Sequence, residues 1–200
     1  MIKNGFFNSV DDDRLYNADD LSTFFYNLFT DGVLALPEDA LKVTAADGLK
    51  VKVAPGFAMI FAKYFMNTAD LIVPMPAAHD TYPRIDRVVI RLDRQQRNMV
   101  LAVLIGTPAA TPVVPALTRN SNIYELSLAK VGIRANASAV TGGDIVDERK
   151  NEEVCGFVKA RFAVNGDNTI KPDVVFDIAT PVFVGVGGEP ILGVAEQQGG

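Results

Sequence analysis

The densest group of side chains able to do chemistry lies between Arg84 and Arg94, where four arginines accompany two aspartates. A guanidinium group binds carboxylates and phosphates through paired hydrogen bonds, so this stretch is a candidate site for an anion or an acidic saccharide. The same arginines can instead form ion pairs that hold a β-hairpin together. Such pairs contribute little free energy where water reaches them.

Acidic partners for the arginines must come partly from elsewhere, because this stretch contains more arginines than aspartates. Glu125, and Asp147 together with Arg149, are the partners that we expect. We therefore interpret residues 82–93 as a framework strand, whose arginines fix the hairpin and the proline-rich segment after it.

Residues suited to nucleophilic or metal chemistry are scarce. The chain has one histidine, His79, and one cysteine, Cys155, and it lacks P-loop, GxGxxG and GxSxG motifs. A zinc site of Cys and His ligands needs more such residues than one chain supplies. We expect His79 to be a turn or packing residue and Cys155 a small buried one. The sequence predicts a protein that is not an enzyme, with no catalytic residue, cofactor or metal.

The acidic composition limits the possible partners further. The net charge is −5 and the isoelectric point about 4.9, without a basic block, which argues against a nucleic-acid partner. The run Asp11 to Asp13 lacks the alternating spacing of a calcium loop, so we expect a solvated turn. No apolar run approaches the roughly 18 residues of a membrane span, and the N-terminus does not resemble a signal peptide. We expect no membrane insertion and folding in the cytoplasm.

One amphipathic helix is predicted near the N-terminus, over residues 17–32. Asn17 is the expected N-cap, and Gly32 is the expected left-handed terminator. Its apolar positions recur at helical spacing and are Leu21, Phe24, Phe25, Leu28 and Phe29. A stripe this apolar either covers a sheet or meets copies of itself in other subunits.

From Leu41 onward the apolar residues alternate with a period of two, which indicates β-strands. Residues 57–65 read as one strand. Residues 99–105 are apolar on both faces and suit a central strand. The prolines of residues 107–115 indicate an extended crossover. The predicted fold class is mainly β: an antiparallel β-sandwich or partly closed barrel after one amphipathic helix, with a β-rich C-terminal appendage.

Three regions are expected. Residues 1–40 form an arm and the helix, and residues 41–150 form the antiparallel β domain. Residues 151–200, which follow a charged cluster, form a β appendage for oligomerisation or receptor contact. In that appendage Val182 and Val184 are candidate intersubunit strand residues, because an apolar strand needs a partner.

Several short motifs together resemble a family of phage and prophage tail proteins, the baseplate or tail-fibre structural proteins. They cover roughly residues 1–158, in matching order and spacing. The motifs are Gly5-Phe6-Phe7-Asn8-Ser9, Tyr16-Asn17-Ala18-Asp19-Asp20, Asp31-Gly32-Val33, Val53-Ala54-Pro55-Gly56-Phe57-Ala58, Tyr82-Pro83-Arg84-Ile85-Asp86-Arg87-Val88-Val89, Arg91-Leu92-Asp93, Gly106-Thr107-Pro108, Pro115-Ala116-Leu117-Thr118-Arg119 and Asp147-Glu148-Arg149.

This resemblance implies an N-terminal attachment module in the virion tail, usually a homotrimer that contacts other tail or baseplate proteins, and it carries no catalytic residues. The expected interface residues are then Phe24, Phe25, Leu28 and Phe29. The alternative is a saccharide-binding module that recognises the host surface, in which Tyr64 and Tyr82 stack on sugar rings.

Overall fold

The computed structural model describes residue 11 and residues 16–161. The chain divides into two compact units, residues 1–159 and 160–200. Only residues 160 and 161 of the second unit are described, and all the helices and strands of the described chain belong to the first unit.

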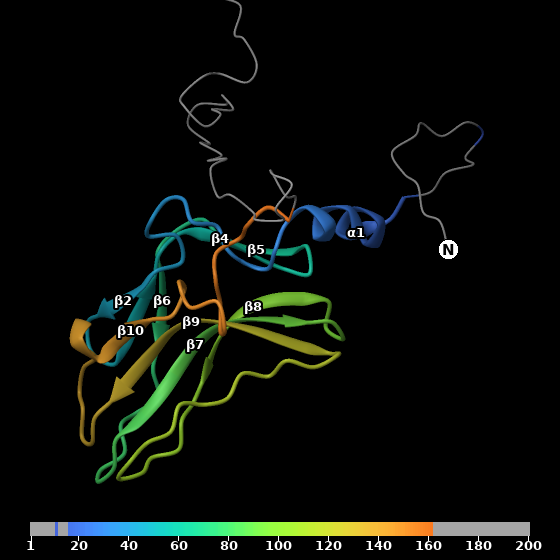
Figure 1. Ribbon diagram of the computed structural model, residues 1–200. Helices are drawn as coiled ribbons and strands as arrows, with labels where there is room; N and C mark the ends of the chain where they lie inside the picture. Colours follow the sequence, from blue (N-terminus) through green and yellow to red (C-terminus); the bar gives the residue numbers. More distant parts are fainter. Residues whose placement is uncertain (1–10, 12–15, 162–200) are drawn as a thin grey trace, which may run out of the picture. The chain divides into compact units, whose positions relative to one another are not determined.

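The described chain consists of ten β-strands in three antiparallel sheets and one α-helix (Figure 1). This confirms the predicted mainly β fold with an N-terminal helix, and no sheet of the described residues closes into a barrel. The helix is α1 (Ala18–Leu28), and a 3₁₀ turn, η1, covers Gly142–Asp144. The strands are β1 (Gly32–Val33), β2 (Val43–Ala46), β3 (Lys50–Val53), β4 (Gly56–Ile60), β5 (Lys63–Asn67), β6 (Leu71–Pro74), β7 (Arg84–Asp93), β8 (Asn98–Leu104), β9 (Ile123–Ile133) and β10 (Ile145–Asp147).

One layer is a long bent hairpin, with β3 and β4 in one arm and β5 and β6 in the other. The register shifts between its halves, where residues 54–55 lie opposite residues 68–70. The side-chain amide of Asn67 bridges this irregularity by donating to the carbonyls of Val53 and Ala54. β2 pairs with β3, and β1 pairs with β4, so each half becomes a three-stranded sheet.

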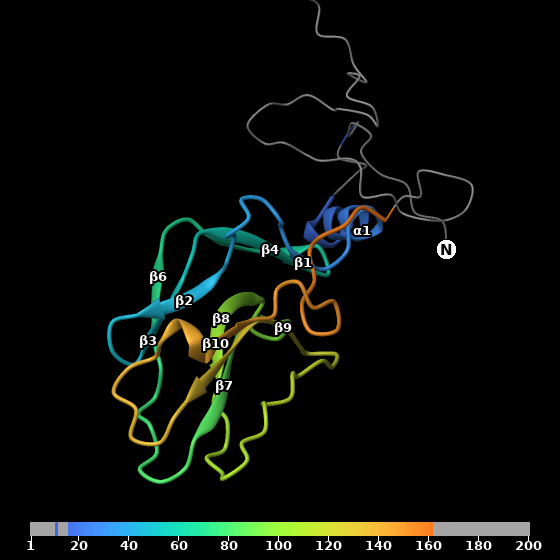
Figure 2. The same ribbon diagram turned by 60° about the vertical axis from the view of Figure 1, so that its left-hand side comes forward.

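The second layer is the four-stranded sheet β10-β9-β7-β8, and a shared apolar core joins the two layers (Figure 2). β10 contacts β2 along one side of this sandwich, and β8 contacts β5 along the other. Removing apolar surface from water is the main favourable term in such a fold. The fully buried side chains of this shared core include Val51, Val53, Ile60, Val88, Ile90, Leu126 and Leu128.

The turn between β4 and β5 contradicts the prediction of one strand over residues 57–65. Phe61 and Ala62 adopt left-handed φ angles of 49° and 57° and reverse the chain between two short strands. Glycine, asparagine and aspartate are the usual residues in such a turn. The prediction failed because neither residue here gives that signal.

Tertiary contacts of Phe61 explain how this strained turn persists. Its backbone N–H donates to the carboxylate of Asp31 at 2.7 Å. Its ring meets the edge of the Tyr124 ring at 4.9 Å between centroids, and the Arg94 guanidinium lies 4.6 Å from the ring centroid. The turn therefore connects the hairpin layer to β9 and to the tip of β7–β8.

The start of α1 confirms the predicted N-cap. The Asn17 side chain accepts hydrogen bonds from the N–H groups of Asp19 and Asp20, while the Asp20 carboxylate accepts one from the N–H of Asn17. This reciprocal capping satisfies backbone donors that the first helical turn leaves without partners. The helix therefore has a strong start signal of its own.

The end of α1 differs from the prediction, because Gly32 does not terminate the helix. The C-cap is Phe29, in extended conformation, and Gly32 belongs to β1. A Cβ atom at Gly32 would lie 2.6 Å from the carbonyl oxygen of Gly156. Gly32 is thus required by a close backbone approach rather than by helix termination.

The segment after β10 remains attached to the sandwich. The N–H of Val33 donates to the carbonyl of Gly156, and the N–H of Val158 donates to that of Val33. The compact unit accordingly continues to Lys159.

The position of β8 also contradicts the sequence prediction. Residues 99–105 were expected in a central strand, but β8 is an edge strand that pairs only with β7 in the part of the chain that the structure describes. β7 takes the central place because it pairs with both β8 and β9.

The crossover after β8 allows a test of this packing. A Cβ atom at Gly106 would lie 2.1 Å from the carbonyl oxygen of Ile85, so the backbone would have to move. We expect Gly106→Ala to lower the free energy of unfolding by about 3 kcal/mol in urea titrations. The control is Gly142→Ala, where no atom lies within 4 Å of the added Cβ, and it should change stability by less than about 0.5 kcal/mol. Equal effects of the two substitutions would contradict the close approach.

Candidate functional site

The first three charged residues of the stretch 84–94, which are Arg84, Asp86 and Arg87, lie inside the protein rather than in an open site. β7 turns Val88 and Ile90 toward the apolar core and Arg87 and Arg91 toward the opposite face. The carboxylates that face these arginines are buried as well, and Glu125 is 0% exposed. Burying a charge is costly unless it is paired and hydrogen-bonded, so each pair must be satisfied locally.

Arg84 and Asp86 form the first buried ion pair. Arg84 Nε donates to both carboxylate oxygens of Asp86, at 3.0 and 3.1 Å. The remaining guanidinium nitrogens donate to the carbonyls of Ala77 and Pro76, each at 2.6 Å. Asp86 also accepts the N–H of Gly106 at 2.9 Å. The pair therefore joins β7 to the segment before it and to the crossover after β8.

Glu125 is the centre of the second group. It pairs with Arg91, which confirms the prediction that Glu125 is a partner of the β7 arginines. One carboxylate oxygen accepts from Arg91 Nε at 2.7 Å, and the other accepts from the N–H of Thr118 at 2.7 Å. Arg119 adds a link by donating to the carbonyls of Glu153 and Val154. These bonds hold the end of the crossover on the sheet.

Glu148 is the centre of the third group, which the sequence reasoning did not find. Its carboxylate accepts from the Ser127 hydroxyl at 2.5 Å and from an Arg87 terminal nitrogen at 3.3 Å. Arg87 Nε lies 3.1 Å from the same carboxylate and forms an ion pair with it, but the N–H is not directed well enough at the oxygen to form a hydrogen bond. Arg87 also donates to the Pro115 carbonyl at 2.7 Å, which confirms that a β7 arginine fixes the proline crossover.

Arg149 and Asp147 form the fourth group, which confirms the ion pair that the sequence predicts for them. Burial raises the pKa of Asp147, but hydrogen bonds from Arg149 outweigh it and hold the pKa below its ordinary value. Arg149 also donates to the carbonyls of Glu38 and Ala40. The Arg149 side chain is buried, so this pair anchors the loop before β2.

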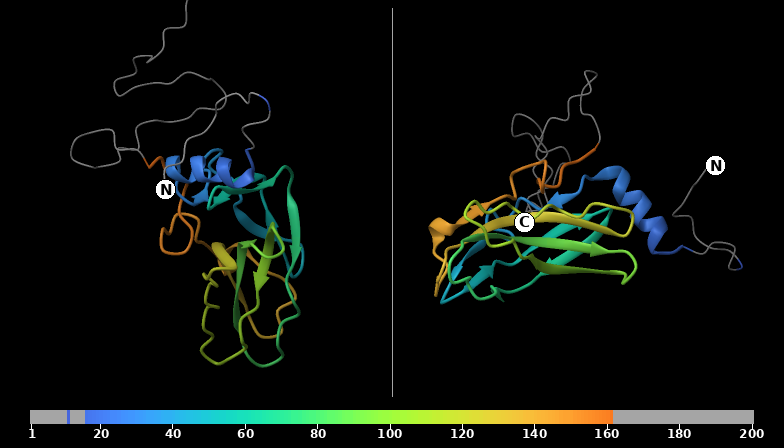
Figure 3. Two further views of the ribbon diagram at one scale, coloured as in Figure 1. Left: turned by 90° about the vertical axis from the view of Figure 1, so that its right-hand side faces the viewer. Right: turned by 90° about the horizontal axis from the view of Figure 1, so that it is seen from below.

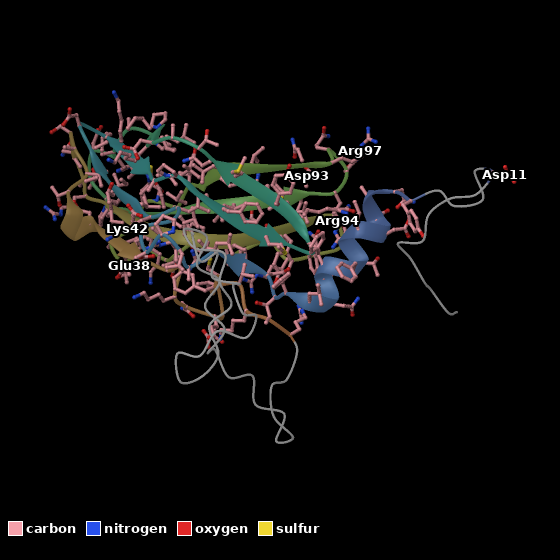
Figure 4. The ribbon with its side chains drawn as sticks, turned by 90° about the horizontal axis from the view of Figure 1, so that it is seen from above. Asp11, Glu38, Lys42, Asp93, Arg94 and Arg97 are labelled. Carbon is pink, nitrogen blue, oxygen red and sulfur yellow. The ribbon has the colours of Figure 1, made fainter. Side chains whose placement is uncertain are left out.

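A shallow hollow of about 380 Å³ lies beside this pair. Its acidic and basic groups are equal in number, so it carries no excess charge that would select an ion. Figure 4 shows Glu38 and Lys42 close together, away from Arg94. The lining residues are Glu38, Asp39, Lys42, Asp147, Arg149 and Lys150.

His79 and Cys155 have the structural surroundings that were expected. The Nδ1 atom of His79 accepts hydrogen bonds from the N–H groups of Thr81 and Tyr82, so the imidazole stabilises a turn. Cys155 is buried, and burial raises the pKa of its thiol to about 12. A thiol in this state is a poor nucleophile at neutral pH.

The described residues also limit the chemistry in other ways. Residues 11 and 16–161 contain no group of three His, Cys, Asp or Glu side chains that could hold a metal ion. Within the same residues no helix is both long and apolar enough to cross a membrane.

Comparison with known proteins adds nothing to this description. No family model matches the chain, and searches of curated proteins and of solved structures found no significant match.

Exposed apolar side chains, rather than charged ones, form the candidate interaction surfaces. On α1, Phe24 is 45% exposed and Phe25 is 42% exposed, and their rings meet edge to face. Leu28 and Phe29 are partly buried. These four residues and Leu21, itself exposed, are the predicted helical stripe, and their role as an interface stays a prediction.

The helix turns a different face toward the β4–β5 hairpin. Lys63 beside the turn reaches the Asp19 carboxylate and the Ser22 hydroxyl, while Tyr26 packs against Phe61. Positions 19, 22 and 26 lie on one side of an α-helix and positions 21, 24, 25 and 28 lie on another. The phenylalanine stripe is therefore not the surface that attaches α1 to the hairpin.

A second exposed apolar surface lies on the outer face of β4 and β5, and sequence reasoning missed it because residues 57–65 were read as one strand. Tyr64 is 65% exposed and stacks on Phe57, which lies diagonally opposite on the neighbouring strand. The same face carries Met59 and Met66. Only the correct turn position places these side chains together.

The remaining predicted site residues are not brought together. Tyr82 lies beside His79 in the segment before β7, whereas Tyr64 lies on β5. Their roles as sugar contacts stay predictions. Val182 and Val184 lie outside the described residues.

The buried carboxylates can be tested against a surface one. We expect Glu125→Ala to lower the free energy of unfolding by about 3–5 kcal/mol, because it leaves Arg91 without its buried partner. Asp70→Ala removes the exposed pair with Lys52 and should cost less than about 1 kcal/mol. Urea titrations of both variants measure the difference. Similar costs would mean that the Glu125 group does not anchor the crossover.

The single thiol reports whether residues around Cys155 open. Because Cys155 is buried and its pKa is raised to about 12, we expect very slow reaction with Ellman's reagent at neutral pH. The same protein in concentrated urea should react at the rate of a free thiol. Fast stoichiometric reaction under native conditions would show that the segment is not packed as described.

Proposed function

We propose that this protein is a non-enzymatic structural component of a phage or prophage tail, either a baseplate or a tail-fibre protein. In this proposal it assembles as a homotrimer in the virion and attaches to other tail proteins. The resemblance of its ordered motifs to such proteins supports the tail assignment. The exposed apolar surfaces support assembly as the activity.

The observation that carries the proposal is the exposed stripe of α1. The capping box gives the helix a strong local start, yet α1 has no fully buried residue. Asp19, Ser22 and Tyr26 of the helix contact the hairpin, and all three lie outside the stripe. Leu21, at 47% exposed, and Phe25 are large apolar side chains for which association with a second copy removes surface from water.

The positions of the resembling motifs agree with a scaffold role. Arg84, Asp86, Gly106, Glu148 and Arg149 belong to these motifs, and each takes part in a buried contact that joins distant segments. A shared pattern that fixes the framework is expected for a module whose task is to present surfaces to neighbours. It differs from the pattern of an enzyme family, whose motifs supply reactive groups to a cleft.

The helix surface predicts how assembly will respond to charge. We expect the double substitution Leu21→Lys and Phe25→Lys to abolish three-fold association, since it places ammonium groups in the apolar contact. Light scattering at micromolar concentration measures the mass, and circular dichroism checks that the fold is retained. Val146→Lys, at a residue 53% exposed on β10, is the matched control and should keep the wild-type mass.

A wild-type protein whose mass is not a multiple of three chains would contradict the proposed trimer. An unchanged mass in the helix variant would contradict the helix contact.

A further inference from the structure

β8 is a regular edge strand whose outer side makes no hydrogen bond in the described part of the chain. It pairs with β7 in continuous register, from Arg87 opposite Leu104 to Asp93 opposite Asn98. No turn, loop or side-chain hydrogen bond reaches residues 98–105 from any other described segment. One side of this strand therefore presents free backbone N–H and C=O groups.

Natural edge strands usually carry features that prevent pairing with another chain, and in the described part of the chain β8 lacks them apart from its contact with β5. Such features are a charge, a proline, a bulge, a very short strand or a covering segment. Residues 99–105 read Met-Val-Leu-Ala-Val-Leu-Ile, without a charge or a proline, and the β7–β8 register contains no bulge. The bulge of this sheet lies on the other side of β7, between Val88 and Val89 in its pairing with β9.

The side chains of β8 are apolar on both faces, which favours covering both faces of the strand. Met99, Leu101 and Val103 pack against the core. On the opposite face Val100 is 39% exposed. Ile105, just past the strand, is 60% exposed. An apolar strand of this kind suits the interior of a sheet, whereas in the described part of the chain β8 has one strand neighbour, β7.

The same side of the sandwich has further exposed apolar residues. β5 contacts β8 there, and β6 continues the arm that β5 begins. The right-hand view of Figure 3 shows β7, β8 and β9 as one layer, with β8 along its border. The exposed residues of the β5–β6 arm are Tyr64, Met66, Leu71 and Ile72.

We propose that β8 pairs with β8 of a second copy of this chain, antiparallel and about a two-fold axis near Leu101. This pairing joins the two four-stranded sheets into one continuous sheet. It is independent of the helix contact proposed above, because β8 and α1 are separate elements.

Charge selects the antiparallel arrangement of the second copy. Arg94 and Arg97 lie at the tip of the β7–β8 hairpin with Asp93, at one end of β8 (Figure 4). Parallel strands in register would place the two Arg97 side chains side by side. Antiparallel strands place each tip beside residues 105–108 of the partner, which carry no charge.

Symmetry favours a second copy over an unrelated strand. In a two-fold contact each β8 edge satisfies the other, so no free edge remains and the assembly closes. The antiparallel partner also continues the alternating direction of the sheet, since all pairs in β10-β9-β7-β8 are antiparallel. A head-to-tail contact would leave a free edge at each end and produce fibres.

The test substitutes Val100 with lysine, because that side chain is partly exposed and its replacement does not disturb the core. Two lysines then meet near the axis, and we expect the association constant to fall by at least about 100-fold. Val146→Lys is again the matched control, and circular dichroism must show a folded protein. Hydrogen exchange gives a second readout: in the wild type, the outward amides of residues 98–105 should exchange more slowly as protein concentration rises.

Masses of three proteins separate this inference from the proposed trimer. If both contacts exist, closed symmetry gives about six chains for the wild type, two for the helix-face variant and three for Val100→Lys. A wild type of two chains that Val100→Lys converts to one supports the β8 contact while the helix contact fails. A Val100→Lys variant with wild-type mass, together with exchange in β8 that is independent of concentration, overturns the inference. Fibres would overturn the two-fold arrangement.

Discussion

The fold depends on the need to satisfy carboxylates that lie inside the protein. Asp86, Glu125 and Glu148 are nearly or fully buried. A buried carboxylate without a cation and hydrogen-bond donors would cost several kcal/mol, so each of the three requires an arginine and further donors. Those donors come from Gly106, Thr118 and Ser127.

This requirement explains how long irregular segments can be held in a defined course. The crossover of residues 107–120 has no sheet partner along most of its length, and proline removes several of its donors. It is fixed where its backbone meets the charged groups, through the Pro115 carbonyl and the Thr118 N–H. Ion pairs of this kind are weak evidence for added stability, but removing one partner is costly. Their effect here is to select one course for the chain.

The sequence predicted correctly the features that depend on residues close together in the chain. The Asn17 cap depends on residues within one helical turn, and the alternating faces of β7 follow from its period of two. The pairing of Arg91 with Glu125 was accessible because an excess of arginines in one strand demands carboxylates elsewhere. Glu148 was missed as a partner because nothing local connects it to Arg87, from which it is far in sequence.

The failures share a physical cause, which is that tertiary contacts outweighed local signals. Phe61 accepts a left-handed conformation because Asp31, Tyr124 and Arg94 hold it. Gly32 resembled a helix terminator, yet its missing side chain makes room for the backbone of residues 156–158. In both cases the decisive partner lies about 30 residues or more away in sequence, beyond any periodic pattern.

The distribution of charge and apolar surface separates folding from assembly in this molecule. Charged groups fix the sheet from within, whereas Leu21, Phe25, Tyr64 and Val100 remain exposed. In the proposed assembly the helix stripe and the β8 edge therefore act without competing for the residues that maintain the fold. In the same proposal β8 gains a second strand neighbour, and the central position that its sequence predicted is reached in a sheet to which each of two chains contributes half.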